Sequence, residues 1–161
     1  VLASLIGTLV VFVFAAIYYR RAGLVANFSL ILNVVFLLAM LVPLQATLTL
    51  PGIAGLALTL GMAIDSNVII FERIREELRA GASNRASIEA GFFRAHWAIM
   101  DSNITTLLSG IVMYIFGSGP VRGFAVTLSI GILTTLFTAL FVCKLLLEVL
   151  PMEDRDGKLS I

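Results

Sequence analysis

Two acidic triplets inside apolar sequence are the residues most able to carry chemistry. Asp65-Ser66-Asn67 follows one apolar run, and Asp101-Ser102-Asn103 repeats the pattern near the start of another. A carboxylate near the middle of a membrane helix costs about 2.5 to 3.5 kcal/mol on insertion scales, so such residues usually face protein or water and have a function. Asp65 is therefore the first candidate for a proton-binding group.

Small residues accompany Asp65 at helical spacing. Ala57, Gly61 and Asp65 are separated by four residues each, so they share one face of a helix. Small side chains let membrane helices approach closely, which predicts that Asp65 faces the helix bundle and that Ala57 and Gly61 are packing residues. Gly131, four residues from a threonine on either side, predicts a second packing face on the last apolar segment.

A polar line also runs from the second triplet. Asp101, Thr105 and Ser109 again recur every four residues. They either extend a hydrated path beside Asp65 or pack helices through their hydroxyl groups, and the sequence leaves both readings open. The candidate proton pathway consists of Asp65, Asn67, Asp101, Asn103 and Thr105.

No lysine or arginine lies in an apolar segment near the depth expected for Asp65. A buried carboxyl group without a cation tends to keep its proton, and one beside an arginine tends to release it. A cation that moves toward and away from Asp65 would therefore make a proton relay, and it must come from outside these segments. The alternatives are an aspartate that stays protonated, or one that only hydrogen-bonds neighbouring hydroxyl groups.

The composition is that of a polytopic membrane domain. Hydrophobic residues make up 60% of the 161 and charged residues 13%, whereas soluble domains have roughly 45 to 50% and 25%. We expect one all-α domain, a bundle of five transmembrane helices, with a cytoplasmic loop at 72–95 and a cytoplasmic tail at 151–161. A span needs about 20 apolar residues; the predicted spans are 1–18, 24–43, 51–71, 96–116 and 123–150. Because the chain opens on Val1 in an apolar run, we expect it to be a piece of a longer protein.

The basic residues are distributed unequally between the two sides of these five spans. Arg122 alone falls on one side. The other ten of the 11 lysines and arginines fall on the opposite side: Arg20, Arg21, Arg73, Arg75, Arg79, Arg85, Arg94, Lys144, Arg155 and Lys158. By the positive-inside rule the basic side is cytoplasmic, so the Val1 end is predicted outside and the Ile161 end inside.

Other classes of function find no support in the residues. Cys143 is the single cysteine, and no nucleophile with its base, phosphate loop or metal-ligand spacing is present, so neither an enzyme nor a metal or organic cofactor is predicted. Basic residues form no stripe interleaved with aromatics, so no nucleic acid is expected. His96 and Trp97 are interpreted as an interfacial anchor. The charged run 72–79 is interpreted as a solvated helix or a docking site for a cytoplasmic partner.

Several motifs resemble the SecD/SecF protein-export family, which is related to the resistance-nodulation-division transporters. They cover 48–55, 61–78, 101–107 and 117–125. The resemblance favours the SecD branch, because SecF members typically carry an arginine where Asp101 stands. Ser66 and Ser102 depart from the alanine that is common at their positions, and His96 with Trp97 is unusual; these departures concern local packing.

This resemblance implies an export function at the bacterial cytoplasmic (inner) membrane. The five spans would be the second to sixth of a six-span half, whose first span and large extracytoplasmic domain precede Val1. The implied partners are SecF (separate or fused), the SecYEG translocon, YajC, the translocating preprotein and the lipid bilayer, with protons as the coupling ion. Asp65 matches the family's proton-pathway aspartate, and an arginine of SecF would supply the cation. The alternatives are a small-molecule efflux transporter of the same superfamily and a structural scaffold for a partner subunit.

Overall fold

The described residues form a set of helices. A computed structural model describes residues 2–43, 49–150, 159 and 161. The elements are α1 (Leu2–Tyr18), α2 (Arg20–Leu41), α3 (Leu50–Arg79), α4 (Asn84–Phe116), α5 (Pro120–Phe137), the π-helical turn η1 (Thr138–Val142) and α6 (Cys143–Val149). The predicted all-α bundle is confirmed. The predicted tail lies almost entirely outside the described residues.

Four helices are long and apolar enough to cross a membrane. They are α2, α3, α4 and the continuous rod 120–149 formed by α5, η1 and α6. These cover the spans predicted at 24–43, 51–71, 96–116 and 123–150. The span predicted at 1–18 coincides with α1, an apolar helix of 17 described residues.

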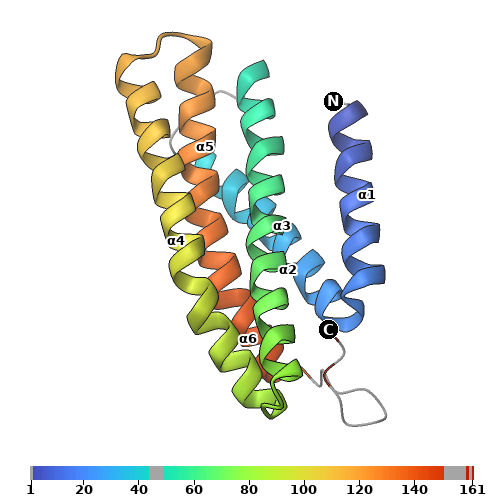
Figure 1. Cartoon of the computed structure of the whole chain (residues 1–161). Helices are drawn as coiled ribbons and strands as arrows, with labels where there is room; N and C mark the ends of the chain where they lie inside the picture. The colour runs from blue at the N-terminus through green and yellow to red at the C-terminus, as the bar shows by residue number, and fades with distance from the viewer. Residues whose placement is uncertain (1, 44–48, 151–158, 160) are drawn as a thin grey trace.

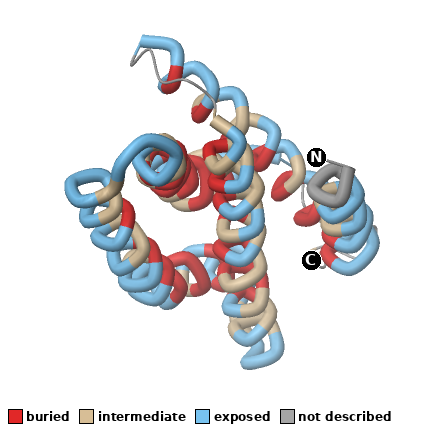
Figure 2. Tube along the Cα trace, turned by 90° about the horizontal axis from the view of Figure 1, so that it is seen from above, coloured by how far each residue is buried: buried red, intermediate tan, exposed pale blue. Residues whose placement is uncertain are grey.

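Three of these rods form the body of the bundle. Helices α3, α4 and α5 pack on one another pairwise, and α3 with α5 makes the most extensive contact. Helix α2 crosses them obliquely, while α1 packs mainly on α2 and stands beside the body (Figure 1). Seen along the bundle, buried residues line the inside of the three-helix body and much of the surface of α1 is exposed (Figure 2).

Local chemistry explains where α3 begins and ends. Thr49 caps its start by accepting a hydrogen bond from the Gly52 amide at 3.2 Å, and Pro51 occupies the first turn, where its missing N–H is not needed. At the other end Gly81 adopts a φ of +89°, and the amides of Gly81 and Ala82 donate to the carbonyls of Leu78 and Glu77. This is a Schellman motif, in which Gly81 supplies the left-handed residue that ends the helix.

The connection between the third and fourth predicted spans, 72–95, is mostly helical. Helix α3 continues through Arg79 and α4 begins at Asn84, so only residues 80–83 connect them. Ser83 caps α4 by accepting a hydrogen bond from the Ala86 amide at 3.4 Å. The charged ends of both helices therefore project beyond the apolar spans as one helical hairpin. Arg94 and Glu77 join its arms with an ion pair of 2.9 Å.

Two apolar clusters fill the bundle. The larger lies at the charged end and includes Tyr19, Phe71, Ile74 and Cys143 among its buried residues. The smaller contains Leu37 and Leu41, near the end of α2, and Ile130 in the middle of α5. Together they account for the tight contact of α2 with the rod 120–149.

Candidate functional site

Asp65 lies on the outer face of α3 in the isolated chain. Its side chain is exposed and makes no hydrogen bond or ion pair with any described residue. The face that α3 presents to the bundle includes Thr59, Ala63, Ser66 and Asn67. This differs from the expected placement of Asp65 inside this bundle. The reason is helical geometry: two residues correspond to about 200° of rotation, so Asp65 and Asn67 point to opposite sides.

Glycines show which face of α3 is closely packed within the chain. A side chain built at Gly131 of α5 would run into Thr59, which is fully buried. A side chain built at Gly61 would meet nothing within 4 Å, and Gly61 is exposed like Asp65. Ala57, the other predicted packing residue, is half-buried. Close packing inside the chain thus uses the Gly131 contact, while the face of Gly61 and Asp65 is left open.

The second triplet has the same arrangement on α4. Asp101 and Thr105 are exposed and Asn103 is buried. The hydroxyl group of Thr105 donates to the Asp101 carbonyl at 2.9 Å, and that of Ser109 donates to the Thr105 carbonyl at 3.1 Å. The polar line is therefore not used to pack helices among the described residues; it lies on an exposed face.

Buried amide side chains form the polar interior of the bundle. Asn67 and Asn103 each bury a side-chain oxygen that has no partner among the described residues. Asn33 of α2 donates from Nδ2 to the hydroxyl oxygens of Thr135 and Thr138, at 3.0 Å each. A side-chain amide held by two hydroxyl groups ties α2 to the start of η1, since leaving buried polar groups unpaired is costly.

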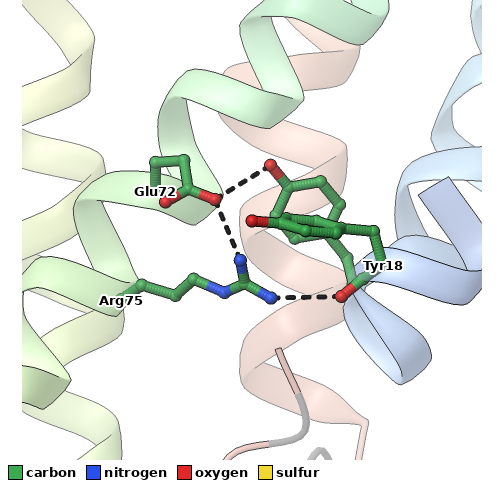
Figure 3. A network of polar contacts seen from close by, with 4 residues as sticks. Tyr18, Glu72 and Arg75 are labelled. Atoms are coloured by element: carbon green, nitrogen blue, oxygen red, sulfur yellow. Dashed lines mark hydrogen bonds and ion pairs between the residues drawn. The ribbon is translucent and has the colours of Figure 1, made fainter. Parts of the chain in front are cut away.

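A polar network at the α1–α2 elbow is a feature that sequence reasoning missed. Tyr19 donates to Glu72 Oε1 at 3.1 Å, and Arg75 donates to the same oxygen at 3.0 Å (Figure 3). Arg75 also donates to the Tyr18 carbonyl at 3.1 Å and stacks over both tyrosine rings. Burial and then the hydrogen bond to Glu72 raise the pKa of the Tyr19 phenol, so it remains a donor at neutral pH.

The elbow itself is sterically unusual. Arg20 has a φ of +49°, a left-handed conformation that non-glycine residues rarely adopt. A side chain at Gly23 would collide with the Ala15 carbonyl oxygen, so glycine permits α1 to fold back against α2. The run Tyr18 to Arg21, two aromatic residues followed by two arginines, is typical of an interfacial anchor. In the structure Tyr19 is only 2% exposed and packs on Phe71 instead.

Replacing Arg75 by alanine should loosen this elbow. The change removes two hydrogen bonds of a charged group that is only 16% exposed, so we expect a loss of about 1 to 3 kcal/mol of stability. Limited trypsin digestion of the whole protein should then cleave faster after Arg20 or Arg21. Arg73→Ala is the matched control: Arg73 pairs with Glu76 on the same helix at 47% exposure, which is worth less than about 1 kcal/mol. Equal cleavage rates in both variants would contradict a holding role for the network.

Comparison with known proteins identifies the family. The family profile described as "Protein export membrane protein SecD/SecF, C-terminal" matches residues 1–153. The chain belongs to this family. A SecD/SecF relative from Magnetococcus marinus, named protein translocase subunit SecD, is 53% identical over 98% of the chain and 30% of its own length. Another with that name, from Syntrophobacter fumaroxidans, is 51% identical over 100% of the chain and 30% of its own length.

A solved SecD/SecF structure has the same fold. The crystal structure of SecDF, a translocon-associated membrane protein from Thermus thermophilus, superposes with a TM-score of 0.87 at 50% sequence identity. The match covers 90% of this chain and 20% of that one. The chain thus spans about a third or less of the length of the relatives it matches. It corresponds to a C-terminal membrane region of the SecD type, and the resemblance seen in the sequence is confirmed.

Proposed function

We propose that this chain is the membrane part of a protein-export subunit that couples proton movement to late steps of preprotein translocation, with Asp65 as the proton-binding group. The observation that supports this proposal is that Asp65 is exposed on an open face beside Gly61, without a partner among the described residues. In a bilayer a carboxylate on a lipid-facing surface is costly. This face is therefore one that another helix bundle or water covers in the assembled protein.

The partner that we propose for this face is the SecF half, as a separate or a fused chain. Gly61 leaves room for a neighbouring helix to approach closely, as small residues do in membrane proteins. An arginine on that helix would make Asp65 release its proton when near and bind it again when distant. Asp101 and Thr105 lie on the exposed side of α4, and we propose that they line the water-accessible route to Asp65.

The placement that we propose in the cell rests on the charges. The hairpin of α3 and α4 carries its ion pairs beyond the apolar spans, and we propose that this end lies in the cytoplasm of a bacterium. At the opposite end of the bundle Arg122, in the first turn of α5, donates to the Tyr114 carbonyl at 3.1 Å and would lie outside. SecYEG, YajC and the translocating preprotein are the remaining proposed partners.

Deletion of the whole gene separates this function from its two alternatives. Export predicts that secreted proteins accumulate as precursors and that drug sensitivity is unchanged. Efflux by a related transporter predicts drug sensitivity with normal secretion. If the chain is only a scaffold, the deletion should cause a secretion defect. Any variant that still assembles, including Asp65→Asn, should then restore normal secretion. A normal rate of secretion in the deletion strain would contradict the proposal.

A further inference from the structure

A groove between α4 and the end of the rod 120–149 lies outside the proposed proton site. It has a volume of about 820 Å³. Its walls are mostly apolar, and three large side chains stand out into it: Phe93 is 73% exposed, Trp97 72% and Phe141 67%. In a chain that crosses a membrane, such a groove opens toward lipid acyl chains.

Charged and polar side chains also line this groove. Lys144 supplies an ammonium group, His96 supplies ring nitrogens, and Glu89 and Glu148 supply carboxylates. Lys144 Nζ and Glu148 Oε1 are 3.9 Å apart and both side chains are about half exposed, so their pairing is weak. Glu89 makes no hydrogen bond or ion pair with the part of the chain that the structure describes.

The helix directions place the two glutamates at the polar boundary of the membrane, whereas His96 adjoins Trp97. Glu89 precedes the apolar part of α4, and Glu148 is near the end of α6, whereas Trp97 and Phe141 lie about two turns further into the spans. An amphipathic ring such as that of Trp97 prefers this boundary region. The groove therefore has an apolar section inside the bilayer and a charged section at its surface.

From this combination we infer that the groove binds a phospholipid with a primary-amine head group, that is, a phosphatidylethanolamine. The phosphate of such a lipid can accept hydrogen bonds from Lys144 and His96, and its ammonium group can donate to Glu89 and Glu148. A phosphatidylglycerol head group offers these carboxylates no cation. A choline head group has a cation but no N–H donor. This inference holds whether or not Asp65 carries protons.

Trp97 provides a direct probe, because it is the single tryptophan of the chain and lies in the groove. The whole protein is reconstituted in phosphatidylcholine bilayers that contain a minor fraction of lipid with brominated acyl chains. The head group of that lipid is ethanolamine, choline or glycerol. The emission of Trp97 is obtained by subtracting the fluorescence of the Trp97→Phe variant from that of the parent protein. We expect the ethanolamine lipid to be preferred about two- to fivefold over choline, the range of one exposed ion pair.

Charge-neutral double variants test the head-group contacts. Lys144→Gln with Glu148→Gln should remove the preference, while Arg73→Gln with Glu76→Gln, which removes an ion pair elsewhere, should keep it. A tryptophan at exposed Phe116, in the Trp97→Phe background, reports contact with bulk lipid.

Four results would overturn the inference. Equal quenching by the ethanolamine and choline lipids shows no selectivity, and a preference for the glycerol lipid shows an anionic site instead. Quenching at Trp97 far below that at position 116, with every lipid, shows that a protein segment covers the groove. An unchanged preference in the Lys144 and Glu148 double variant shows that these charges do not bind the head group.

Discussion

Asp65→Asn is expected to abolish the proton-driven part of export while the protein still assembles. Asparagine has nearly the same shape as aspartate but takes up and releases no proton. Because Asp65 is exposed on its own chain and supports no contact among the described residues, the substitution removes no interaction within this bundle. Export into inverted membrane vesicles should fall to the level measured without a proton gradient.

Three further variants give this experiment its controls. Asp65→Glu keeps a titratable group in nearly the same place and should retain part of the gradient-dependent export. Glu76→Gln removes an exposed carboxylate outside the apolar spans and should leave export unchanged. Gly61→Leu keeps Asp65 but fills the open face, so it should weaken assembly with the partner half. Gradient-dependent export at the parental rate in Asp65→Asn would instead favour a scaffold role.

The helix ends and the helical class could be predicted because they depend on local chemistry. Pro51 fits a first helical turn and Gly81 a left-handed residue after the last turn, whatever surrounds them. The outer placement of Asp65 could not be predicted in this way. Spacing shows that Ala57, Gly61 and Asp65 share a face, but a face of small residues does not reveal whether its partner is in the same chain.

The elbow network shows a second limit of sequence reasoning. Tyr18 and Tyr19 have the same chemistry, yet only Tyr19 is buried against Phe71 and bonded to Glu72. The difference arises from the turn at Arg20, which is a tertiary feature without a local motif. Helical spacing explains why Glu72 and Arg75 pair, but their contacts with Tyr18 and Tyr19 join residues more than 50 positions apart.

A loss of stability is also expected for Gly131→Ala on α5. Alanine favours a helix over glycine by about 1 kcal/mol, so the change alone should stabilise the rod. At Gly131, however, the new methyl group would occupy the space of the Thr59 side chain, and overpacking of this kind costs about 1 to 3 kcal/mol or more. We expect a lower midpoint of thermal unfolding for the detergent-solubilised whole protein. Gly61→Ala, with the same chemistry in open space, should be neutral or slightly stabilising.

Thr59 decides whether steric overlap is the cause. Thr59→Ala removes both branches of that side chain at the α3–α5 contact, so it should recover part of the stability lost in Gly131→Ala. In a double-mutant cycle the two residues should then couple by about 0.5 to 3 kcal/mol, as contacting residues do. Additive effects, or equal destabilisation by alanine at positions 61 and 131, would show that α3 and α5 do not meet closely at this point. The main structural argument that Asp65 lies on an open face of α3 would then fail. One rotation of α3 about its axis determines both the face that meets α5 and the face that is left open.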